Sequence, residues 1–301
     1  MSAADRDARA GFAFVIMSAA AFGAMAILAR FAYASGVDTP TLLALRFTIA
    51  AVAMAAIARA RGVAMPHGST LAGLILLGAL GYGGQAFSFF TALTLAPAGL
   101  VALLLYLHPA LVAVLAAMFL HERFNAAKLV ALALALLGTA LTVAPALSAP
   151  LAAGESAGMV AGIGFALAAA TFYSIYIIAG AWLGQHAPPL GMSVIVIASA
   201  AAVFVAAALV RGPQWPKSAD GWLAVVAIAL VSTVAAITLY FAGLQRIGPT
   251  RASTLSTVEP LVTVTLAAVI LGETIAPVQL GGGALILAAV ILLARASRRA
   301  T

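Results

Sequence analysis

The sequence predicts an all-α integral membrane protein of ten transmembrane helices, arranged as two inverted five-helix repeats. Three observations lead to this prediction. Of the 301 residues, 65% are hydrophobic and only 8% are charged, which leaves too few polar side chains to cover a water-soluble domain. Ten apolar runs close to the roughly 20 residues that cross a bilayer follow one another along the chain. A proline-to-glutamate spacing also recurs half a chain apart.

The ten runs account for almost the whole chain, with only short connections between them. The first run is too long for the core of a signal peptide and has no clear small-residue cleavage site after it, so we interpret it as a helix. We expect residues 11–145 to form the first repeat and residues 158–294 the second, with residues 146–157 as the linker. The predicted spans are residues 11–33, 40–58, 69–92, 97–120, 127–145, 158–182, 189–210, 221–244, 250–271 and 277–294.

The repeat rests on one spacing that occurs twice. Pro109 and Glu122 are 13 residues apart in YLHPALVAVLAAMFLHE, and Pro260 and Glu273 are 13 residues apart in TVEPLVTVTLAAVILGE, with a shift of 151 residues between the copies. Because the chain holds only four glutamates, such a match would be rare by chance. Each unit contains five spans, an odd number, so the second unit enters the membrane from the opposite side. Inverted halves recur in secondary transporters, where they share a site near the midplane.

The net charge of +7 follows the connections between the spans. The basic residues are dispersed and form no single soluble face, which argues against nucleic-acid binding. With both termini cytoplasmic, eleven basic residues lie inside and two outside, as the positive-inside rule requires. We therefore predict a multi-pass protein of a bacterial-type inner membrane. The inside set is Arg6, Arg9, Arg59, Arg61, Arg123, Lys128, Arg246, Arg251, Arg295, Arg298 and Arg299, and the outside pair is Arg211 and Lys217.

Several classes of chemistry are excluded by what the sequence lacks. There is no cysteine, so disulfides and thiol catalysis are ruled out. There is no Walker-type glycine loop, so ATP is not expected to drive the protein directly. No motif in the chain implies a metal or another cofactor, and we expect none.

Five stretches of sequence resemble one known family. They are AFGAMAILAR at 21–30, LLALRF at 42–47, GYGGQAFSFFTALTLAPAG at 81–99 and the two proline-to-glutamate segments. Together they are similar to the EamA-domain branch of the drug/metabolite transporter (DMT) superfamily, over almost the whole chain. The resemblance implies two EamA repeats, ten helices and the export or exchange of small metabolites. Within that branch the chain most resembles the ten-helix, YddG-like amino-acid exporters, although nothing in these motifs fixes the substrate.

Two titratable residues occupy equivalent positions in the repeats. His108 immediately precedes Pro109, and Glu259 immediately precedes Pro260, both near the middle of a span. A proline there frees a backbone carbonyl, which tends to face a cavity rather than lipid. Our hypothesis is that both residues line a central cavity, with Glu259 binding a substrate ammonium or exchanging a proton. The alternative is a hydrogen-bonded pair that only fixes helix packing.

For two arginines and two glutamates we favour structural roles over direct roles in transport. Arg46 lies about seven residues into its span, and we favour a role in pinning carbonyls or carboxylates near the outer gate over direct substrate binding, although its long stem can also snorkel outward. Arg30, near a helix end, is interpreted as interfacial. Glu122 and Glu273 each end a helix, where a carboxylate can cap the first amides of the next helix.

The remaining candidates are polar and aromatic residues at similar depth. The glycine-rich stretch 81–84 in the third span becomes residues 232–235 in the eighth when shifted by 151 residues, so both copies place small or hydroxylic residues there. Such residues either line a cavity or simply allow helices to pack. The full set of candidate binding or coupling residues is Glu259, His108, Tyr82, Gln85, Tyr106, Tyr173, Tyr176, Thr233, Tyr240 and Arg46.

These observations together predict a secondary transporter. It would export or exchange amino acids or similar amphiphilic solutes by alternating access, driven by the substrate's own gradient or by protons. A multidrug or nucleoside-like exporter is the first alternative, and a channel or an intramembrane enzyme using His108 and Glu259 as acid and base are the others. The expected partners are the lipid bilayer and a small-molecule substrate, with or without protons. Because the repeat supplies its own symmetry, we expect a monomer.

Overall fold

The computed structural model describes residues 3–119, 126–148, 153–183, 187–247, 252 and 255–297. Every element of regular structure in these ranges is helical. The first half contains α1 (Ala3–Gly23), α2 (Met25–Ala34), α3 (Thr39–Ala60), α4 (Gly68–Leu76), η1 (Leu77–Tyr82), α5 (Gly83–Leu95), α6 (Ala98–Leu105), α7 (His108–Phe119) and α8 (Ala126–Ser148). The second contains α9 (Ala153–Leu183), α10 (Pro189–Arg211), α11 (Ala219–Ala229), η3 (Leu230–Ala235), α12 (Ala236–Ile247), α14 (Val258–Leu271) and α15 (Pro277–Ser297).

These elements form the ten predicted membrane helices. Eight continuous helical stretches are long and apolar enough to span a bilayer, and two shorter apolar helices, Val258–Leu271 and Pro277–Leu293, complete the set within the described residues. Large apolar side chains lie exposed on the outside, such as Leu209, Val210 and Val269, where hydrocarbon replaces water as the solvent. The predicted all-α, ten-helix membrane fold is confirmed.

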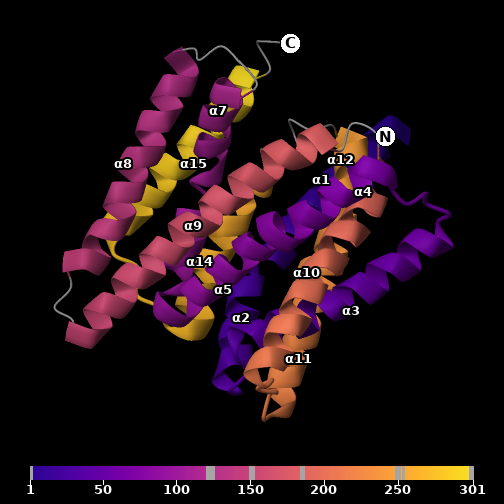
Figure 1. The fold of residues 1–301 in the computed structure, drawn as a ribbon. Coiled ribbons are helices and arrows are strands. Elements are labelled where there is room, and N and C mark those ends of the chain that lie inside the picture. The colour runs from indigo at the N-terminus through magenta and orange to yellow at the C-terminus, as the bar shows by residue number, and fades with distance from the viewer. Residues whose placement is uncertain are drawn as a thin grey trace.

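The two halves pack against each other through pairs of helices. The most extensive helix contacts pair α8 with α15, α3 with α10, α1 with α12, and α5 with α9, and each of these pairs takes one helix from each half (Figure 1). The helix α6 likewise packs on α14. Shifting the chain by one repeat exchanges or preserves these pairs, as a pseudo-two-fold relation requires. Figure 1 also shows the start of α1 and the end of α15 at the same end of the bundle.

The helices are interrupted at matching depths in the two halves. The third span passes through the π-helical turn η1 and the eighth through η3, both at the stretches that the repeat relates. The fourth span breaks between Leu105 and His108, and α14 begins at Val258, directly before Glu259. Prolines explain the second pair of breaks, because a proline removes a helical donor and clashes with the preceding turn.

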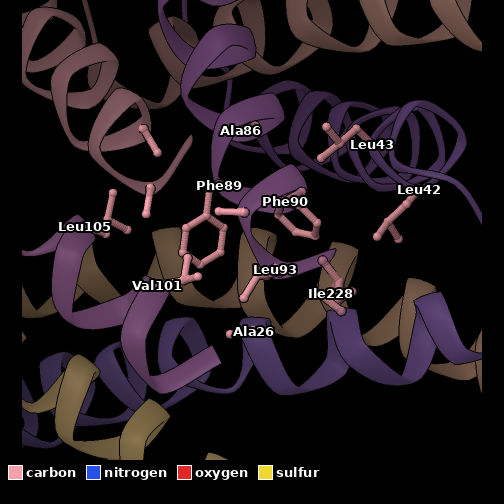
Figure 2. Close-up of a cluster of buried hydrophobic side chains, with 14 of the residues drawn as sticks. Ala26, Leu42, Leu43, Ala86, Phe89, Phe90, Leu93, Val101, Leu105 and Ile228 are labelled. Atoms are coloured by element: carbon pink, nitrogen blue, oxygen red, sulfur yellow. The ribbon is translucent and has the colours of Figure 1, made fainter. Parts of the chain in front are cut away.

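A cluster of buried side chains joins the interrupted spans (Figure 2). Phe89 lies on the side of Val101 and Leu105, whereas Phe90 lies toward Leu43 and Ile228. Phe90 is completely buried. The cluster therefore ties α5 to α3, α6 and α11, and it supports the polar residues described next.

Candidate functional site

The site is built around the helix break at Pro260. Because proline has no N–H, the carbonyl of Ser256, four residues earlier, loses its helical donor. The hydroxyl of Tyr106, at the end of α6, takes that place by donating to the Ser256 carbonyl oxygen at 2.8 Å. The same hydroxyl donates to Oε2 of Glu259 at 3.0 Å. One proton is thus shared between two acceptors of the second half, and it comes from a side chain of the first half.

The backbone of Glu259 is held by a close approach between α1 and α14. Thr263 donates from its hydroxyl to the carbonyl oxygens of Glu259 and Gly23, at 3.2 and 2.9 Å. A Cβ atom at Gly23 would lie 2.8 Å from the Glu259 carbonyl oxygen, so only glycine allows this approach. In the other half, Ser174, the repeat equivalent of Gly23, donates to the carbonyl oxygen of His108 at 3.1 Å. Both prolines are therefore preceded by a carbonyl that accepts a hydroxyl proton.

Five ring side chains extend from Glu259 into the protein. Successive ring centroids lie 5.7 Å apart for Tyr106 and His108, 4.6 Å for His108 and Tyr173, 6.0 Å for Tyr173 and Tyr176, and 5.4 Å for Tyr176 and Tyr82. We call these five residues the aromatic row. The row draws on both halves, and the hydrogen bonds of Tyr106 and Tyr82 tie its two ends to charged side chains.

Arg46 lies at the far end of the aromatic row. Its Nη2 donates to the Tyr82 hydroxyl at 3.2 Å and its Nε to the Thr233 hydroxyl at 3.1 Å, and its guanidinium sits 4.7 Å from the Phe47 ring centroid and 5.1 Å from that of Phe90. Only 3% of Arg46 is exposed. Arg46 therefore does not snorkel, and its polar partners are hydroxyls instead of the predicted carbonyls or carboxylates.

Eight of the ten candidate residues thus fall into one connected set. His108 and Glu259 do not bond to each other directly, and Tyr106 connects them. Gln85 is half-buried, and its side chain has no hydrogen bond within the described residues. Tyr240 packs in a separate cluster with Val15 and Ile247.

A second polar contact between the halves was only partly anticipated. The carboxylate of Glu273 accepts the N–H groups of Ala98 at 2.7 Å and Gly99 at 3.0 Å, so it caps α6. Arg30 lies 3.8 Å from the same carboxylate and donates to the Ala96 carbonyl oxygen at 2.8 Å. We call this group of contacts the Glu273 latch.

The expectation that Glu273 caps the next helix was therefore wrong, because α14 ends beside α6 of the other half. The next helix, α15, instead has Gln279 accepting the N–H of Ala276. Arg30 is an ion-pair partner in addition to lying near a helix end. The corresponding residue Glu122 lies outside the described residues. The signal that could have revealed the latch is the repeat itself, since it relates the fourth and ninth spans.

Comparisons with known proteins agree with this architecture. A model of the EamA-like transporter family matches residues 9–144 and 160–295, two ranges offset by the same 151 residues as the proline-to-glutamate segments. An uncharacterized transporter of Archaeoglobus fulgidus is 27% identical over 293 residues, which cover 95% of this chain and 97% of that protein. A solved crystal structure of a protein with 24% identity has a TM-score of 0.65, covers 96% of this chain and 98% of its own, and shares the fold.

Proposed function

The chain belongs to the EamA-like transporter family, and from this premise we propose that it exports or exchanges small amphiphilic metabolites, amino acids foremost, across a bacterial-type inner membrane by alternating access. The family consists of transporters, so an intramembrane enzyme is no longer an alternative. Membership also implies a small-molecule substrate. The substrate class, the direction of transport and the cytoplasmic position of both termini belong to the proposal.

The observation that carries the proposal is the contact between Tyr106 and Glu259 at matched helix breaks. An acid inside a membrane span is costly on insertion scales and tends to mark a pathway. Glu259 is half-buried, and the Tyr106 hydroxyl is the only described partner of its side chain. Its second carboxylate oxygen is left for a substrate ammonium or a proton, which are the two roles we propose.

Alternating access requires a contact between halves that can separate and form again. Tyr106 belongs to the fourth span and Glu259 to the ninth, so relative motion of the two halves changes their hydrogen bond. The breaks beside them supply backbone that can adjust without unwinding a whole helix. A substrate that displaces Tyr106 from Glu259 would thereby bias one arrangement over the other.

The aromatic row supports a nucleoside-like exporter as a second candidate. Four tyrosines and one histidine offer ring faces on which a nucleobase can stack as well as an aromatic amino acid can. Transport assays of the protein should therefore include nucleosides as well as amino acids as candidate substrates.

The experiment is counterflow in proteoliposomes containing the full chain. We expect saturable exchange of at least one amino acid and its loss in Glu259→Gln, while Asp220→Asn, which removes an exposed carboxylate, behaves like wild type. Flux that does not saturate would indicate a channel, and exchange of nucleosides alone would replace the preferred substrate class. Full exchange by Glu259→Gln would remove the proposed role of Glu259.

A further inference from the structure

Arg46 is a buried cation with neutral partners only. It is 3% exposed, and its hydrogen bonds go to the hydroxyls of Tyr82 and Thr233. Contacts with the faces of two phenylalanine rings compensate part of the lost hydration. A charge taken out of water is normally paired or hydrogen-bonded in full, because an unpaired buried ion is strongly destabilising.

No carboxylate whose side chain the structure describes contacts Arg46. Each of them is engaged elsewhere or exposed: Asp7 pairs with Arg246, Asp38 accepts the Thr41 N–H, Asp220 is exposed, Glu259 accepts from Tyr106, and Glu273 contacts Arg30. The positive charge thus has no counter-ion in the described part of the chain. A bound anionic ligand would supply one.

The guanidinium also keeps unused donors. Arginine carries five N–H groups in a planar fork, and the two bonds to Tyr82 and Thr233 use only two of them. The other N–H groups, including both on Nη1, have no partner among the described residues. A carboxylate is the group that such a fork binds best, through two parallel hydrogen bonds.

The surrounding residues hold the fork in one orientation. The Thr233 hydroxyl donates its own proton to the Ile228 carbonyl oxygen at 2.9 Å, so a lone pair is directed to Nε of Arg46. That bond depends on the π-helical turn η3, since Ile228 precedes Thr233 by five residues. Tyr82 and the two phenylalanine rings contact the rest of the Arg46 guanidinium and restrict its orientation. A preorganised donor loses little entropy when it binds an anion.

We propose that Arg46 is an anion subsite that binds the carboxylate of the transported solute. This rests on the proposed function, because it presumes that a solute reaches the aromatic row. It assigns the two charged residues different tasks: Arg46 takes the negative group of the solute, and Glu259, beyond the five rings, takes a proton or a positive group. Solutes that carry a carboxylate are then preferred over their neutral amides.

Ligand-dependent thermal stability of the purified full-length protein tests this without transport. The probes are sodium phenylacetate and its neutral analogue phenylacetamide, with sodium phosphate and sodium chloride as alternative anions. Phenylacetate is expected to raise the unfolding temperature of wild type and of Arg211→Gln, which loses an exposed arginine. Phenylacetamide is expected to have no effect. In Arg46→Gln the apparent affinity for phenylacetate should fall by about tenfold or more, as for a lost charged hydrogen bond.

The second variant keeps the test decisive if Arg46→Gln does not fold. Thr233→Val preserves shape and charge but removes the bond to Nε, and phenylacetate affinity should fall several-fold. The proposal is overturned if acid and amide act alike, if neither substitution weakens phenylacetate binding, or if phosphate or chloride alone reproduces the effect. Failure of the proposed function is distinguishable, because it appears as absent counterflow with phenylacetate binding intact.

Discussion

The two halves of the protein share a scaffold and differ in chemistry at its centre. Both retain a proline at the break, Pro109 and Pro260, and both precede it with a residue whose backbone carbonyl accepts a hydroxyl proton. Only the second half places a carboxylate there, whereas the first half places His108. The backbone arrangement at the break is therefore shared by the two halves, whereas the side chains placed there differ. The following predictions test how far this asymmetry extends.

The largest effect on stability is expected at the hydroxyl that joins the halves. Tyr106→Phe leaves the Ser256 carbonyl without a donor and frees the Glu259 carboxylate, which should lower the free energy of unfolding by about 1–3 kcal/mol. Thermal unfolding in detergent measures the change. Tyr240→Phe is the matched control, because the Tyr240 hydroxyl has no hydrogen bond among the described residues.

A double-mutant cycle separates the two acceptors of Tyr106. Pro260→Ala returns an N–H group that can satisfy the Ser256 carbonyl within the helix. Tyr106→Phe should then be less destabilising in the Pro260→Ala background than in wild type. Equal losses in both backgrounds would mean that the freed carbonyl contributes nothing to the contact between the halves.

A smaller effect is expected at the Glu273 latch. Glu273→Ala removes the cap of α6 and the partner of Arg30, a loss of about 1 kcal/mol. The equilibrium constant for separation of the start of α6 from Glu273 should therefore rise by about fivefold. Because the chain has no cysteine, a single cysteine at buried Leu100 reports opening through its rate of thiol labelling. If Glu273→Ala labels no faster than an Asp220→Asn control, the Glu273 latch does not hold α6 against α14.

The smallest effect is expected at His108. Neither ring nitrogen has a hydrogen-bond partner within the described residues, and Nδ1 is buried. His108→Phe preserves the ring contacts with Tyr106 and Tyr173, so counterflow should change by no more than about threefold. Loss of transport comparable to that in Glu259→Gln would make the two halves chemically equivalent and would contradict the asymmetry.

The sequence predicts this fold because its main features are local. Apolar run lengths define the spans, and the repeated proline and glutamate define the halves. The sequence predicts less well which side of each helix faces the lipid and which side faces the interior of the protein. A membrane helix is apolar on both its lipid side and its buried side, so it has no clear amphipathic stripe. From the sequence alone, Gln85 and Tyr240 are therefore candidates equal to Tyr82, although of these three only Tyr82 belongs to the aromatic row.

The remaining differences from the predictions arise from how the helices pack in three dimensions. From position alone, Arg46 could reach the interface or the interior, and the hydroxyls of Tyr82 and Thr233 decide between these only once three spans are packed together. Likewise, Glu273 was expected to act on its neighbour in sequence. The helix that it caps, α6, lies beside it only because the fourth and ninth spans meet.

We propose that Glu259, which accepts a hydrogen bond from Tyr106 where the halves meet, couples substrate transport to the change between the two access states. Its most direct test is the pH dependence of counterflow for wild type, Glu259→Gln and Asp220→Asn, reconstituted at equal protein density. We expect a pH-dependent rate in wild type and Asp220→Asn and a residual, pH-independent rate in Glu259→Gln. A Glu259→Gln protein with the rate and pH profile of wild type would contradict it.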